Sequence, residues 1–200
     1  MDTTQAMSAS TTPRRSRTTA VTTPTLDLDA LSRMDVAALG ELYARGAHPA
    51  EVDALEGNPR GRMLAVRTLD RGVAAGAIRS LAGASFFPWG GKTFAGRGAR
   101  GTGVNRLHLF GRHQLFPFHT RIAESAIDGA PCIALDYDLP DNPGIIRKIH
   151  DEVREVSPGL FLGPAMWKTD RRPALVLWFA LDTGVQSKPV GHARDFARSP

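Results

Sequence analysis

The pattern of hydrophobic and polar positions predicts helices early in the chain. Residues 35–46 place apolar side chains at helical spacing, with Asp35 suited to the N-cap and Gly46 to the end of the helix. We expect this helix to pack across an open end of the main body. Residues 70–83 show a second, weaker helical pattern that Gly76 interrupts.

A third helix is expected over residues 143–156. Asn142 suits its N-cap and Pro143 its first position, and Pro158 with Gly159 ends it. The expected buried stripe is Ile145, Ile146, Ile149 and Val153. The expected solvated charged face is Asp151, Glu152, Arg154 and Glu155, with His150 at its edge.

The rest of the pattern predicts strands. From Phe86 onward, short apolar runs alternate with turn residues, which is typical of antiparallel β-structure. The pattern predicts a short strand over residues 63–66, one or two strands over residues 107–125, and a closing hairpin from "LFLGPAMWK" and "PALVLWFALD". Many short strands, glycine turns and few helices predict a small antiparallel barrel or a strongly bent sheet, and such barrels often enclose a ligand-sized interior.

Length and composition indicate one domain with two tails. The chain has 200 residues, 42% of them hydrophobic, which suffices for a sizeable core. Residues 1–25, rich in Thr and Ser, are expected to be a disordered tail, residues 26–184 the domain, and residues 185–200 a loose tail. No stretch approaches the roughly 20 apolar residues of a membrane-spanning helix, so no membrane span is expected.

The net charge gives little support to nucleic-acid binding, and the cysteine content excludes an intrachain disulfide. The net charge of +5 lies partly in the N-terminal stretch, and the remainder is too small for a nucleic-acid groove unless it is concentrated. Cys132 is the only cysteine, so an intrachain disulfide is impossible and a cytoplasmic location is expected. In an apolar strand, Cys132 is expected to be a small buried hydrophobe and not a nucleophile.

Three short motifs resemble a known group of families. They are Gly57 and Gly61 followed by Arg62, then "WGGKTF" at residues 89–94, then the hairpin "PGLFLGPAMWK" with "LVLWFALD". Together they resemble the bacterial families of unknown function named for a Gly-x-Trp-x-Gly motif, in which a GxWxGR turn precedes a WxGKxF turn. The resemblance spans residues 55–182.

This resemblance implies a fold and a kind of ligand, and no reaction. The implied fold is mainly β: a lipocalin-like antiparallel barrel with a few flanking helices, able to hold an apolar ligand. Pro59 stands where the motif has its tryptophan, so the contribution of that ring is absent or comes from Trp89.

One predicted strand, residues 132–139, carries two carboxylates on one face. Because side chains on a strand alternate, Asp136 and Asp138 point one way and Tyr137 the other, and Tyr137 reaches a ligand only if the register turns it inward. Two interpretations stay open: the acidic face meets water, or it lines the barrel cavity, where its charges must be paired. The candidate catalytic residues of the second interpretation are Asp136, Asp138, His119 and Arg121.

The favoured function is binding of an apolar small molecule, such as a lipid, an isoprenoid or a polyketide-like compound, inside the barrel. The alternative is a cofactor-free isomerase, cyclase or lyase that acts on such a molecule by acid/base catalysis. No cofactor is expected. The expected ligand-binding residues are Trp89, Lys92, Phe94, Phe118, Tyr137, Trp167 and Trp178.

Other kinds of site find little support in the sequence. His108, His113 and His119 lack a strong metal signature such as HExxH, so no metal is expected. The basic segment "GRGARGTG" lacks phosphate-loop spacing and is expected to be a flexible surface loop. A third hypothesis, salt-sensitive binding to a nucleic acid or membrane surface, is weakened because the aromatics lie in apolar runs. Its contacting residues are Arg97, Arg100, Arg106 and the arginines of the tails.

Overall fold

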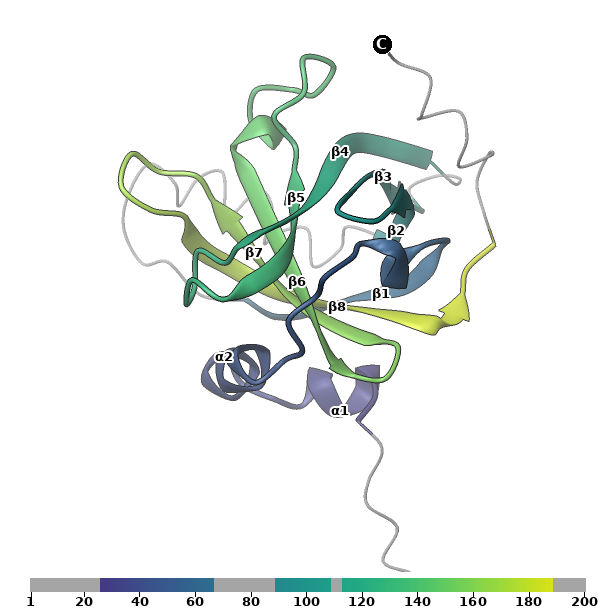
Figure 1. Ribbon diagram of the computed structural model, residues 1–200, viewed down its shortest axis with the longest axis vertical. Coiled ribbons are helices and arrows are strands. Elements are labelled where there is room, and N and C mark those ends of the chain that lie inside the picture. Colours follow the sequence, from purple (N-terminus) through teal and green to yellow (C-terminus); the bar gives the residue numbers. More distant parts are fainter. Residues whose placement is uncertain (1–25, 67–88, 109–112, 189–200) are drawn as a thin grey trace, which may run out of the picture.

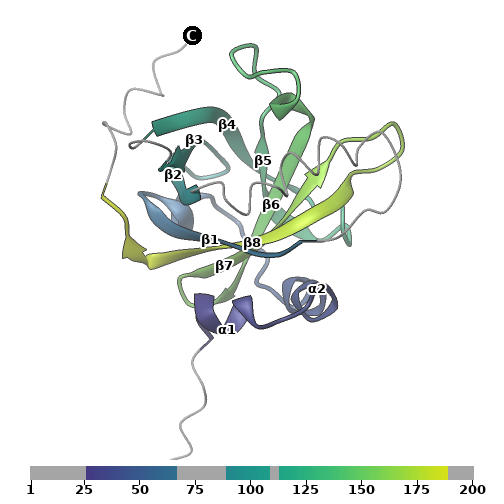
Figure 2. The same cartoon turned by 180° about the vertical axis from the view of Figure 1, so that it is seen from behind.

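Eight antiparallel strands form a closed barrel in the computed structural model, which describes residues 26–66, 89–108 and 113–188. Each strand pairs with the next along the chain, and β8 pairs with β1 (Figures 1 and 2). The strands are β1 (Pro59–Val66), β2 (Trp89–Arg97), β3 (Arg100–Leu107), β4 (His113–Glu124), β5 (Pro131–Asp136), β6 (Ile149–Ser157), β7 (Leu160–Trp167) and β8 (Ala174–Gln186). This confirms the expected mainly β fold, a lipocalin-like antiparallel barrel with a few helices.

In the described part of the chain, two α-helices pack on the outside of the barrel wall (Figure 1). They are α1 (Leu28–Ser32) and α2 (Val36–Ala44). α2 is the helix expected over residues 35–46, and the Asp35 side chain caps it by accepting a hydrogen bond from the Ala38 N–H at 2.8 Å. Its buried residues, Leu39 and Tyr43, contact the outer side of the wall and not an open end, because β7 and β8 present apolar residues there.

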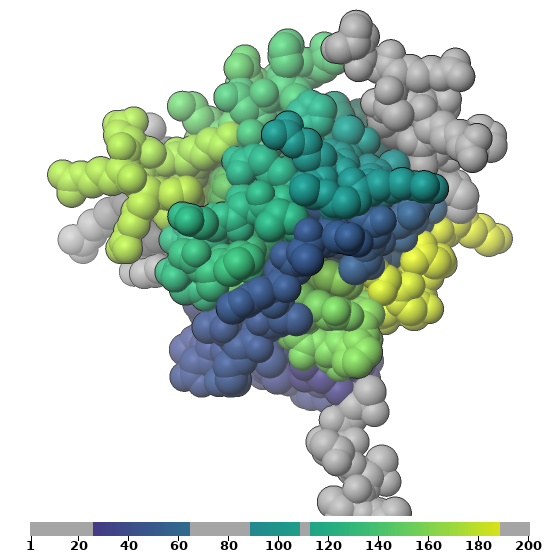
Figure 3. Space-filling model, in the orientation of Figure 1, coloured from purple at the N-terminus to yellow at the C-terminus, as the bar shows by residue number. Residues whose placement is uncertain are grey.

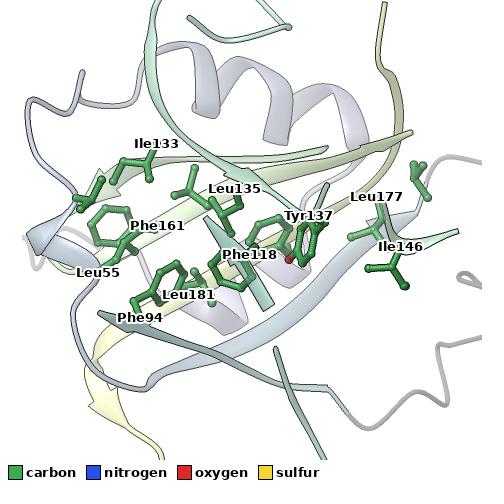
Figure 4. Close-up of a cluster of buried hydrophobic side chains, with 14 residues drawn as sticks. Leu55, Phe94, Phe118, Ile133, Leu135, Tyr137, Ile146, Phe161, Leu177 and Leu181 are labelled. Carbon is green, nitrogen blue, oxygen red and sulfur yellow. The ribbon is translucent and has the colours of Figure 1, made fainter. Parts of the chain in front are cut away.

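One end of the barrel is closed by the chain that joins α2 to β1. This segment runs across the surface in Figure 3 and includes the short 3-10 helix η1 (Asp53–Leu55). Val52 and Leu55 are buried in the interior cluster, and Figure 4 shows Leu55 beside Phe94 and Phe161. Side chains fill this end, and the cavity that the described residues line lies toward the other end.

Strand β8 is buried on both faces, which explains its long apolar run. Phe179 and Leu181 face the barrel interior, whereas Trp178 and Ala180 face outward and pack beneath the two helices. Continuous apolar sequence is the expected signature of a strand covered on both sides. The predicted closing hairpin, β7 followed by β8, is confirmed.

The prediction of a helix over residues 143–156 is wrong, because residues 149–157 form strand β6. Only one 3-10 turn, η3 (Ile146–Lys148), precedes the strand. Asp151 and Val153 lie on the interior side, and Glu152 and Arg154 lie on the outer side beneath α2. The expected solvated face is wrong as well: Asp151, Glu152 and Arg154 are only 3%, 0% and 0% exposed.

The glycine-rich basic segment is the hairpin of β2 and β3, and not a flexible loop. Gly98, with φ of 61°, makes its turn. Gly103 lies against the ring of Phe118, where a Cβ atom would approach to 2.4 Å. The glycines therefore allow close packing inside the barrel.

A buried polar cluster on the outer face of β6 ties α2 to the barrel. Glu152 accepts hydrogen bonds from the hydroxyls of Tyr43 and Ser125 at 2.9 and 2.6 Å and from the Ala126 N–H at 2.7 Å, and it pairs with His150 at 2.8 Å. Burial acts to raise the pKa of Glu152, but these partners outweigh it and hold the pKa below its ordinary value of 4.5.

This arrangement predicts acid-sensitive stability that depends on Glu152. Its contribution is present above pH 4.5 and is lost as the pH falls through the lowered folded-state pKa. The variant Glu152→Gln is expected to lower the free energy of unfolding by about 1.5–3 kcal/mol at pH 7, and this deficit shrinks as the pH falls below 4.5. Urea unfolding at several pH values measures it. The exposed Glu41→Gln is the control, and a deficit that does not change with pH would contradict the prediction.

Several expectations fall outside the described residues: the helix at 70–83, the tail at 1–25 and most of the tail at 185–200. Strand β8 continues to Gln186, two residues into the expected C-terminal tail. No helix in the described part of the chain is long and apolar enough to cross a membrane.

Candidate functional site

The barrel half away from η1 holds a cavity of about 230 Å³. Figure 4 shows Ile146 and Leu177 on this side, apart from the filled end with Leu55. The walls are mostly apolar and aromatic. Prominent lining residues are Trp89, Phe116, Ile149, Trp167, Leu177 and Phe179.

Four buried polar side chains form a cluster at the inner end of this cavity. They come from four parts of the barrel: β2, β3, the residue after β5, and β6. We call Lys92, Asn105, Tyr137 and Asp151 the polar floor. Their exposed fractions are between 2% and 8%, and all but Lys92 line the cavity.

Lys92 is the centre of the polar floor. Its ammonium group donates three hydrogen bonds: to Asn105 Oδ1 at 2.8 Å, to the Tyr137 hydroxyl oxygen at 2.6 Å and to Asp151 Oδ2 at 3.0 Å. An ammonium group has three N–H donors, so all three are used. Lys92 and Asp151 form a buried ion pair with no net charge.

The other donors of the polar floor are used as well. The Tyr137 hydroxyl donates to Asp151 Oδ2 at 3.0 Å. The Asn105 amide donates to the Tyr137 oxygen and to the Phe116 carbonyl, both at 3.2 Å, and the Trp89 indole N–H donates to Asn105 Oδ1 at 3.1 Å. One acceptor is different: among the described residues, Asp151 Oδ1 is buried and has no hydrogen-bond partner.

Burial shifts the pKa values of Lys92 and Tyr137. Burial lowers the pKa of Lys92, and the neighbouring Asp151 carboxylate opposes that shift. Burial, followed by the Asp151 charge, raises the pKa of Tyr137 well above its ordinary value, so the phenol keeps its proton. Four aromatic ring centroids lie 5.0–5.3 Å from Lys92 Nζ and add cation–π stabilisation: Trp89, Phe118, Tyr137 and Phe179.

A β-bulge in β4 shapes the cavity wall next to the polar floor. The β3–β4 register shifts where Val104 pairs with Pro117 and Asn105 with Leu115, which leaves Phe116 as the extra residue. Phe116 has φ of 63°, an uncommon value for a bulky residue, and its carbonyl receives a hydrogen bond from Asn105. Bulges beside binding sites commonly redirect a side chain, and Phe116 lines this cavity.

The interpretation in which the acidic face of β5 lines the cavity is wrong, because the register turns that face outward. Ile133, Leu135 and Tyr137 face the interior instead. Asp136 pairs with Lys168 at 3.0 Å and Asp138 with Arg147 at 2.6 Å, all at the surface. The four candidate catalytic residues all lie outside the cavity: Asp136, Asp138, His119 and Arg121.

The expected ligand-binding residues divide into three groups. Trp89, Tyr137 and Trp167 line the cavity. Phe94 and Phe118 belong to the interior cluster but do not line the cavity. Lys92 does not line it either, and it binds to the cavity-lining Asn105. The assignment of Trp178 to the cavity is wrong: this ring packs outside the wall, 5.5 Å from the Tyr43 ring.

The structure also places the residues of the remaining hypotheses. Arg106 is buried, and its guanidinium donates to the carbonyls of Pro59 and Gly90, so it is not a surface anion contact. Arg97 and Arg100 are exposed at the β2–β3 turn. Cys132 is fully buried, and burial raises the pKa of its thiol to about 12, in keeping with a structural role. Across the described ranges no three metal-binding side chains lie close enough to hold an ion.

Asn105 and Asp151 are the site residues that sequence reasoning missed. Asn105 lies two residues beyond the basic segment interpreted as a loop, and Asp151 lies in the segment interpreted as a helix. A usable signal was present in "IHDEVREV", where Ile149, Asp151 and Val153 recur at the spacing of a strand. The charge of Asp151 on the interior face conceals this alternation, because a strand that lines an apolar interior is expected to carry apolar residues there.

The chain was compared with family models, with curated proteins and with solved structures. No family model matches the chain, and no curated protein matches it. The chain is similar to a protein from Thermomonospora curvata known from a crystal structure, with 25% sequence identity and a TM-score of 0.45. The match covers 78% of this chain and 89% of that one.

Proposed function

We propose that this protein binds a compact apolar small molecule, such as a lipid, an isoprenoid or a polyketide-like compound, in the barrel cavity. The observation that carries this proposal is a cavity of about 230 Å³ with apolar walls and one buried polar cluster at its inner end. Small-molecule sites combine mostly apolar walls with a few placed polar groups, in volumes of ~300–1,000 Å³. The cavity lies just below that range, so a compact ligand fits best.

The Gly-x-Trp-x-Gly resemblance supports the same proposal. In the "WGGKTF" segment, Trp89 lines the cavity and its indole N–H bonds to Asn105, while Lys92 joins Asn105, Tyr137 and Asp151. We propose that the chain is a bacterial member of these families and that this motif builds the ligand site. The buried, unpaired Cys132 suits the cytoplasm as its compartment.

A second candidate function is a cofactor-free isomerase, cyclase or lyase that acts on such a molecule. It is favoured by one observation: Asp151 is a buried carboxylate on the cavity wall with one oxygen that has no partner among the described residues. Such an oxygen can accept a proton from a bound substrate, as a general base does. This role falls to Asp151, since Asp136, Asp138 and His119 lie on the outer surface.

A native extraction tests both functions. The full chain, purified gently from its own host, is expected to carry a near-stoichiometric apolar compound that denaturing extraction releases for mass spectrometry. A single compound supports binding, and a substrate–product pair supports the enzyme. Recovery of no small molecule would contradict the proposal.

The variant Ala165→Phe is expected to abolish this co-purification. Ala165 lines the cavity, and a phenyl ring there occupies the ligand volume. The loss of bound compound should be at least about tenfold, while overpacking lowers the free energy of unfolding by about 1–3 kcal/mol. The control is Ala44→Phe at an exposed position of α2, which should retain the compound. Equal recovery from Ala165→Phe would place the ligand outside the cavity.

A further inference from the structure

In the polar floor, every N–H and O–H donor has an acceptor, but one acceptor, Asp151 Oδ1, has no donor among the described residues. The N–H and O–H groups of Lys92, Asn105, Tyr137 and Trp89 all point to acceptors inside the cluster or to the Phe116 carbonyl. Asp151 Oδ2 accepts two of these bonds, whereas Oδ1 accepts none from the described residues. Because Asp151 lines the cavity, Oδ1 is the hydrogen-bonding capacity that remains for a ligand.

We propose that the ligand of the cavity is an apolar alcohol whose hydroxyl group donates a hydrogen bond to Asp151 Oδ1. This inference rests on the proposed function and names its ligand class. A carboxylate oxygen can only accept, so the ligand must bring the donor. A hydroxyl group does this without bringing a second charge into an apolar cavity.

An apolar acid fits this site poorly. Its carboxylate would need donors, and the only cation of the polar floor, Lys92, already uses its three N–H groups on Asn105, Tyr137 and Asp151. It would also lie beside the Asp151 carboxylate, so two like charges would share a desolvated site. An alkylammonium ion has donors, but Lys92 already neutralises Asp151, which leaves the added charge uncompensated.

Ethers and ketones fit poorly for a different reason. They carry acceptors only, so their binding would leave Asp151 Oδ1 without a hydrogen-bond partner, whereas an alcohol would supply one. A buried polar group without a partner is expensive, and the expected preference for an alcohol over an acceptor-only isomer is about tenfold.

Three small probes test this selectivity on the full chain: 1-hexanol, its isomer 1-methoxypentane, and hexanoate. Their affinities are measured at pH 7 by NMR titration of the isotopically labelled protein. The alcohol is expected to bind about tenfold more tightly than the ether, and hexanoate more weakly than the alcohol. In Asp151→Asn, which gains an amide donor, the alcohol should lose its advantage over the ether. The matched Asp136→Asn on the outer surface should keep it.

A second variant keeps the test valid if Asp151→Asn fails to fold. Asp151→Asn leaves Lys92 buried without its counter-charge, so the double variant Lys92→Met/Asp151→Asn, which removes both charges, repeats the measurement. Equal binding of the alcohol and the ether to the unmodified protein, or tighter binding of hexanoate, would overturn this inference and leave the proposed function standing. Failure of all three probes to bind would overturn both.

Discussion

Replacement of Lys92 by methionine is expected to lower the free energy of unfolding by about 3–5 kcal/mol. Methionine fills much of the same space, but Asp151 Oδ2 loses the ammonium partner that lies 3.0 Å away. The side chain of Asp151 is 5% exposed, so water cannot replace that partner. The lost stability is therefore the free energy of an uncompensated buried charge. Urea unfolding followed by circular dichroism measures it.

A double-mutant cycle separates this pair from its surroundings. In Lys92→Met/Asp151→Asn both charges are absent, so the loss should be smaller than the sum of the two single losses by several kcal/mol. The matched control is the outer pair Lys168 and Asp136, which has the same N–O distance of 3.0 Å but is 31% and 38% exposed. There Lys168→Met should lower the free energy of unfolding by no more than about 1 kcal/mol. Strict additivity at Lys92 and Asp151 would show that the buried pair is not coupled.

The parts of the fold that could be predicted from the sequence are those in which one local signal dominates. Asp35 followed by apolar residues at helical spacing predicts α2, and the structure confirms its cap and its buried face. Two apolar runs around residues 170–173 predict the β7–β8 hairpin, because a run that is buried on both faces needs no alternation. In both cases neighbouring residues carry all the information that is needed.

Strand β6 shows why local signals fail elsewhere. Ile145, Ile146, Ile149 and Val153 have helical spacing, but the barrel closes only if residues 149–157 pair with β5 and β7. That pairing buries charged side chains on both faces, each with partners from distant segments: Lys92 for Asp151, and Tyr43 for Glu152. If charged residues are assumed to be solvent-exposed, such a strand is not predicted. The partners that allow these charges to be buried are brought close only by the tertiary fold.

The site was half predictable for the same reason. Lys92 and Tyr137 attract notice in the sequence as a motif lysine and as the polar residue on an apolar strand face. Their partners Asn105 and Asp151 are recognisable only when four separate parts of the barrel meet. The register of β5 determines which side chains of this segment reach the interior. The register in the structure places Tyr137 inside and Asp136 at the surface.

The two tryptophans of the closing hairpin lie on opposite faces of the barrel wall. Trp178 is 2% exposed and packs with Tyr43 in the outer cluster beneath the helices. Trp167 is partly buried and lines the cavity. They come from neighbouring strands and lie on opposite sides of the same wall, so one packs against the helices and the other lines the cavity.

Removal of the Trp178 ring is therefore expected to affect stability and not binding. Trp178→Ala should lower the free energy of unfolding by about 3–5 kcal/mol, as loss of a buried indole does, and leave the affinity for 1-hexanol within twofold of the unmodified protein. Trp167→Ala should show the opposite balance: an affinity reduced about tenfold or more, with a smaller loss of stability because its ring is only partly buried. Urea unfolding and NMR titration of the same two variants measure both quantities. If Trp178→Ala weakened 1-hexanol binding more than Trp167→Ala, the ligand would have to lie under the helices and not inside the barrel.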